Sequence, residues 1–94
     1  MSLKFEWDER KAALNRQKHR VSFSEAGTVF DDPWFITFLD VEHSIDEDRY
    51  ITIGLSNRHR LLLVAHTERG EGQIRIISAR KATSHEREFY EAGL

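Results

Sequence analysis

The chain has 94 residues, 14 Lys and Arg against 16 Asp and Glu, and a formal net charge of −2. This length predicts one domain over residues 1–94, and the lack of cysteine excludes disulfides and thiolate metal sites and fits a reducing cytoplasm. The longest apolar stretch, Leu61–Ala65, is too short to cross a bilayer, so we expect no membrane segment.

Charge is distributed unevenly along the sequence. Residues 31–48 hold seven acids and no Lys or Arg, whereas residues 58–87 hold seven Lys and Arg against three acids. This predicts a basic surface that can attract phosphate, beside an acidic segment. The alternative interpretation is an ordinary surface of exposed ion pairs.

The first third of the chain predicts one strand and two helices. Residues 5–7 form a short strand, and Asp8 is a suitable N-cap for a helix that runs to about Lys18. Ser22 and Glu25 have the spacing of a capping box, which predicts a second helix.

The remaining two thirds of the sequence predict four strands and a last helix. Asp32-Pro33 ends the second helix, because the residue before proline avoids helical geometry. Thr83 and Glu86 form another capping box. The strands are expected at residues 34–39, 50–55, 61–67 and 73–79. The resulting order β-α-α-β-β-β-β-α predicts an α+β fold, with helices on one face of a mostly antiparallel sheet.

Strand register predicts a polar cluster. A four-residue turn at residues 69–72 would pair His66 with Arg75, and a loop at residues 57–59 would pair Tyr50 with His66. Leu61, Leu63, Ala65, Ile74 and Ile76 would then form the core, and Tyr50, His66 and Arg75 would line the opposite, exposed face, with Glu68 and Gln73 beside them. Such positions are often polar without any function, and one wrong turn length would exchange the two faces.

These residue types suit RNA cleavage without a metal. That reaction needs a base for the 2′-hydroxyl proton, an acid for the leaving oxygen and cations for the phosphate charge. Tyr50, His66 and Glu68 are candidate proton carriers, and Arg75 and Arg80 are candidate phosphate clamps. The five histidines lack zinc-ligand spacing and the sequence has no phosphate-binding loop, so no metal or cofactor is expected.

A basic run closes the first predicted helix. Lys18 and His19 are candidate RNA contacts, and the alternative is a favourable interaction of these cations with the negative end of the helix.

Several segments occur together in a characteristic order over nearly the whole chain. They are Phe5-Glu6-Trp7-Asp8, Asn15 with Lys18-His19, Val21–Ala26, Val29–Pro33, Arg49 before Ile53-Gly54, Ile74–Ala82, Glu86-Arg87 and Tyr90. Through this ordered set the chain resembles the BrnT family of toxins. Arg20 stands where the family commonly has a glycine, which changes the loop after the first helix.

The resemblance implies a RelE-like cytoplasmic ribonuclease that inhibits translation and is neutralised by a BrnA-type antitoxin. DNA would be contacted only indirectly, through the DNA-binding region of the antitoxin. Arg75 and Arg80 match the motif of the last strand, and Arg49 and Lys81 join Lys18 and His19 as expected RNA contacts. The alternatives are an inactive module that binds RNA or protein, and a DNA-binding regulator, which is disfavoured because no predicted helix has a basic, groove-reading face.

Overall fold

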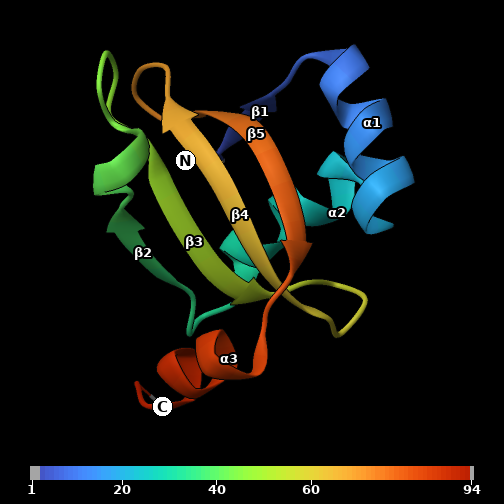
Figure 1. Cartoon of the computed structure of the whole chain (residues 1–94), viewed down its shortest axis with the longest axis vertical. Helices are drawn as coiled ribbons and strands as arrows, with labels where there is room; N and C mark the ends of the chain where they lie inside the picture. The colour runs from blue at the N-terminus through green and yellow to red at the C-terminus, as the bar shows by residue number, and fades with distance from the viewer. Residues whose placement is uncertain (1–2, 94) are drawn as a thin grey trace.

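The computed structural model describes residues 3–93, which form one five-stranded sheet with helices on both of its faces (Figure 1). In chain order the elements are β1 (Lys4–Glu6), α1 (Glu9–His19), α2 (Phe23–Gly27), the 3-10 turn η1 (Thr28–Asp31), β2 (Ile36–Leu39), the 3-10 turn η2 (Val41–His43), β3 (Tyr50–Leu55), β4 (Leu61–Glu68), β5 (Gln73–Lys81) and α3 (Ser84–Glu91). The strand order is β1-β5-β4-β3-β2; β1 runs parallel to β5 and the other pairs are antiparallel. This confirms the α+β, mostly antiparallel fold. The expectation that all helices lie on one face is wrong, because α3 packs on the face opposite α1 and α2.

Side-chain caps begin the helices where the sequence predicts them. Asp8 accepts hydrogen bonds from two backbone amides of α1, and Ser22 accepts one from the Glu25 amide at 3.0 Å. Thr83 and Glu86 complete the expected reciprocal box on α3. The box at Ser22 is only half formed, because the Glu25 carboxylate turns to Arg60 and Ser56 instead. None of the helices within residues 3–93 has the length and apolar character needed to span a membrane.

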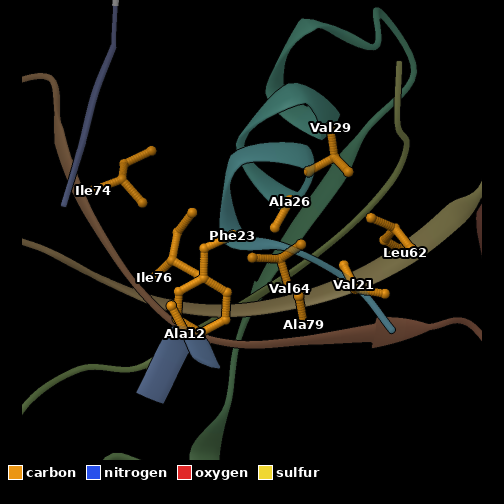
Figure 2. Close-up of a cluster of buried hydrophobic side chains, with 10 residues drawn as sticks. All are labelled: Ala12, Val21, Phe23, Ala26, Val29, Leu62, Val64, Ile74, Ile76 and Ala79. Carbon is orange, nitrogen blue, oxygen red and sulfur yellow. The ribbon is translucent and has the colours of Figure 1, made fainter. Parts of the chain in front are cut away.

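The main core lies on the face of the sheet covered by α1, α2 and η1, called here the first face. Strand residues of β4 and β5 meet apolar side chains of the helices there (Figure 2). Burial of these side chains supplies most of the favourable free energy of folding. The cluster consists of Ala12, Val21, Phe23, Ala26, Val29, Leu62, Val64, Ile74, Ile76 and Ala79.

A smaller core lies on the opposite face, called here the second face. Ile53 and Leu61 pack there with Tyr90 of α3, and Ile51 and Leu63 border them. In Figure 1, α3 lies at the end of the sheet away from the β4–β5 turn.

The structure confirms one predicted register and corrects the other. Tyr50 pairs with His66, as expected. On β5, however, His66 pairs with Ile76 and not with Arg75. The Arg69 amide bonds to the Gln73 carbonyl at 3.0 Å, so the loop has three residues rather than four, and an irregularity beside Ala65 shifts the register again.

This change exchanges the faces of the two strands. Ile74 and Ile76 are in the main core, but they share it with Leu62 and Val64, whereas Leu61 and Leu63 lie on the second face. The expected core of Leu61, Leu63, Ala65, Ile74 and Ile76 is therefore wrong as a single face.

Candidate active site

The structure separates the nine predicted site residues into three groups. Tyr50, His66 and Glu68 occupy first-face positions, Arg75 and Arg80 lie on the second face with Arg49 at its edge, and Lys18, His19 and Lys81 lie at the ends of α1 and β5. The expected exposed row of Tyr50, His66 and Arg75 is therefore wrong, because the shorter turn puts Arg75 on the opposite face from His66.

His66 is a core residue. It is 2% exposed, and its ring lies edge-on to Phe30 of η1 at 5.2 Å and stacks on Tyr50 at 5.9 Å. Its Nε2 is 2.7 Å from Thr52 Oγ1, while Nδ1 has no hydrogen-bond partner among the described residues. Burial lowers the pKa of His66 to about 4, which keeps the ring neutral at physiological pH.

Arg75 lies on the second face at the junction of β1 and β5. It is opposite Glu6 of β1 and Thr67 of β4, and its Nη1 donates a 2.7 Å hydrogen bond to Glu6 Oε2. Both side chains remain partly open to solvent. A guanidinium and a carboxylate are thus held together at the surface, where a solute can reach them.

Arg80 forms a second pair of the same type, farther along β5. Its two terminal nitrogens donate to the two oxygens of Glu86, each at 2.8 Å, in a bidentate arrangement that links β5 to α3. The hydrogen bonds from Arg80 lower the pKa of Glu86 to about 2, and the amide of Thr83 also donates to this carboxylate.

Arg49 borders a pocket of about 350 Å³ between the segment of residues 42–47 and strands β4 and β5. Thr67 and Ile77 form the strand side of the pocket. Arg49 Nε and the Thr67 hydroxyl are closed off from solvent and have no hydrogen-bond partner within residues 3–93.

The remaining predicted basic residues lie at the ends of α1 and β5. Lys18 is exposed and His19 half-buried in its last turn, and Lys81 is exposed at the end of β5. Asn15 holds α1 to β5, because its amide group donates to the Ala79 carbonyl at 2.9 Å and accepts from the Ala79 amide at 3.0 Å. This clamp keeps the end of α1 beside β5.

A network that the sequence analysis missed reinforces the same region. Glu25 is buried and ion-paired with Arg60, which also donates to the backbone carbonyl of Arg20 at 3.1 Å. The hydrogen bond from Arg60 lowers the pKa of Glu25 against the effect of burial. The spacing of Ser22 and Glu25 in the sequence predicted a helix-capping role for Glu25 instead of this ion pair.

The sequence analysis also missed Glu6 as a site residue. It occupies an ordinary strand position, and only the parallel pairing of β1 with β5, 69 residues later in the chain, brings it to Arg75. The described residues hold no group of three or more His, Cys, Asp or Glu side chains arranged to bind a metal ion. The close charged contacts on the second face are the pairs Arg75–Glu6 and Arg80–Glu86.

Two comparisons with known proteins point to the same family. The model of the family described as "Ribonuclease toxin, BrnT, of type II toxin-antitoxin system" matches residues 7–86. The chain is also similar to the crystal structure of the Brucella abortus ribonuclease toxin BrnT, with a TM-score of 0.67 and 25% sequence identity, over 88% of this chain and 100% of that one. Comparison with curated protein sequences gives no match.

Proposed function

The chain belongs to the BrnT family of ribonuclease toxins of type II toxin-antitoxin systems, and from this premise we propose that it is a metal-independent endoribonuclease of RelE-like type. As one domain of residues 1–94, it cleaves RNA in the cytoplasm and thereby inhibits translation. A BrnA-type antitoxin neutralises it, and contact with DNA occurs only through that complex.

The observation that carries the proposal is the pair of arginine–carboxylate contacts on the second face, Arg75 with Glu6 and Arg80 with Glu86. Arginine stays charged and offers a planar fork to phosphate oxygens. An RNA phosphate competes with each carboxylate for its guanidinium. Binding of the substrate at Arg75 then leaves the Glu6 carboxylate free beside it.

The proposed reaction uses that carboxylate as the proton acceptor. Glu6 takes the proton of the 2′-hydroxyl, and the 2′-oxygen bonds to phosphorus to form a 2′,3′-cyclic phosphate. The bond from phosphorus to the 5′-oxygen breaks as that oxygen takes a proton from water and leaves as a hydroxyl. Arg75 and Arg80 stabilise the charge that develops on the phosphate. Neighbouring phosphates of the bound RNA are contacted by Lys18, His19, Arg49 and Lys81.

None of the three proton carriers expected from the sequence fits this reaction well. His66 is 2% exposed and Tyr50 is stacked against it on the first face, away from Arg75. Glu68 is exposed, but it pairs with Ile74 and so also takes a first-face position. The proposal therefore moves the proton acceptor to Glu6.

A second candidate is a binding module of the same fold without catalysis. The observation in its favour is that Arg75 and Arg80 both already have a carboxylate partner. Purified chain incubated in EDTA with labelled RNA, and with DNA of the same sequence, distinguishes the two. Cleavage of RNA alone supports the ribonuclease, whereas RNA retained uncut supports the binding module. Activity restored only by magnesium or manganese contradicts the metal-independent mechanism.

A further inference from the structure

The outer edge of β2 is unpaired within residues 3–93. This strand is the last in the sheet order, with β3 as its one neighbour. The Asp40 amide donates to the Arg49 carbonyl at 2.7 Å, which places positions 36, 38 and 40 in the hydrogen-bonded pairs of the antiparallel ladder. The backbone N–H and C=O groups of Thr37 and Leu39 therefore point outward, away from β3.

Apolar side chains flank this edge on both sides. Phe38 lies on the second face, where its ring meets that of Phe89 edge-on at 5.9 Å, and Leu39 lies on the first face opposite Tyr50. Phe89 is 60% exposed, and Phe38 and Leu39 are also exposed. An exposed apolar edge strand is a template for pairing with another chain, and proteins ordinarily cover or charge it.

A pocket beside the edge can accept an apolar side chain. It has a volume of about 220 Å³ under α3 and is lined by Phe38, Ile53, Leu63 and Phe89, with His85 and Glu86 at its polar side. An apolar side chain of a partner inserted there would be buried between the sheet and α3. Residues that dominate the binding energy of an interface usually fill such buried pockets.

The acidic loop of residues 40–48 continues directly from β2. It contains five Asp and Glu residues and no Lys or Arg. Two apolar side chains of the loop are almost fully in solvent, Val41 at 77% and Ile45 at 88% exposed. The combination of negative charge and free apolar groups is complementary to a basic, apolar segment of a partner.

We propose that an extended segment of the antitoxin adds to the sheet along the free edge of β2. Its backbone pairs with Thr37 and Leu39, an apolar side chain enters the pocket beside Phe89, and basic side chains meet the acidic loop. The inference rests on the proposed function for the identity of the partner. It assigns to the antitoxin a surface separate from the Arg75–Glu6 pair.

A proline substitution tests the backbone pairing. Leu39→Pro removes an N–H that points outward and takes no part in the ladder with β3, a position where edge strands tolerate proline. Leu39→Ala is the matched control, because it shortens the same side chain and keeps the N–H. The probe is the purified product of the reading frame adjacent to the gene of this chain, with affinity measured by titration calorimetry.

Leu39→Pro should weaken binding at least about tenfold relative to Leu39→Ala, since it removes a backbone hydrogen bond and obstructs the edge. Hydrogen exchange of the Thr37 and Leu39 amides should slow in the complex. Equal affinity of the two variants overturns the inference, as does protection of these amides in a dimer of the chain alone. RNA cleavage by both variants, measured separately, should match wild type; a wild-type chain that cuts no RNA refutes the proposed activity without affecting the binding result.

Discussion

The hydroxyl of Tyr90 donates a 2.6 Å hydrogen bond to Asp32 Oδ2, which joins α3 to the turn before β2. The same carboxylate accepts the amides of Trp34 and Leu55 at 2.9 and 2.8 Å. These hydrogen bonds outweigh the opposing effect of burial and lower the pKa of Asp32. Burial and the contact with Asp32 raise the pKa of Tyr90 to about 12.

Tyr90→Phe should therefore lower the free energy of unfolding by about 1.5–3 kcal/mol, the usual range for a hydrogen bond to a charged group. Chemical denaturation measures this change. Tyr50→Phe is the matched control, because no hydrogen bond to the Tyr50 hydroxyl is formed within residues 3–93. Equal losses in the two variants would show that the Asp32 contact adds nothing to stability.

His66 should make the fold sensitive to mild acid. Its pKa is about 4 in the folded chain, against an ordinary value of 6.5 for histidine, so the unfolded chain binds more protons between these values. Stability is then complete above pH 6.5 and falls as the pH drops toward 4. We expect a loss of about 2 kcal/mol between pH 7.5 and pH 5. His66→Gln should remove most of that dependence, and an unchanged slope in the variant would rule out His66 as its source.

Arg80 and Glu86 should respond differently to mutation if Arg80 holds phosphate. Arg80→Ala should lower the RNA cleavage rate by roughly 100- to 1000-fold, as for other lost donors at a developing charge. Glu86→Gln frees the guanidinium, so RNA should bind at least as tightly as in wild type. Steady-state kinetics on both variants tests this, with thermal melts to confirm folding. Similar losses of cleavage rate in the two variants would indicate that the Arg80–Glu86 pair only attaches α3 to β5.

The acidic loop should accelerate association with the antitoxin. Raising salt to about 1 M shortens the screening length to ~3 Å, so the association rate should fall more than the dissociation rate rises. Asp46→Asn should reduce the association rate at low salt. Glu9→Gln on α1 is the control, since it removes one negative charge elsewhere and keeps an acceptor for Trp7. An association rate that is indifferent to salt would contradict this account of the acidic loop.

Local signals in the sequence predicted the elements well, and long-range pairing limited the prediction of the site. Asp8 and Thr83 cap their helices because capping depends on a few neighbouring residues. The β4–β5 register depended on the length of one turn. Gly70 and Gly72 both take positive φ values, which closes that turn with one residue fewer than expected.

The length of the β4–β5 turn decides where His66 and Arg75 lie. A loop of three residues places His66 opposite Ile76 and buries it, and it sends Arg75 to the other face. The partner of Arg75 then comes from β1 at the start of the chain, which no local pattern indicates. Arg75 and Arg80 were identified from their residue type and motif, and their carboxylate partners required the fold.

The most direct test of the central claim is the single-turnover cleavage rate of labelled RNA in EDTA by wild type and by Arg75→Ala. Arg10→Ala, on the exposed surface of α1, is the control for loss of one positive charge. Loss of a charge donor at the phosphate predicts a rate roughly 100- to 1000-fold lower for Arg75→Ala, with wild-type rates for Arg10→Ala and with both variants folded. Cleavage by Arg75→Ala at the wild-type rate would contradict a catalytic site on the second face.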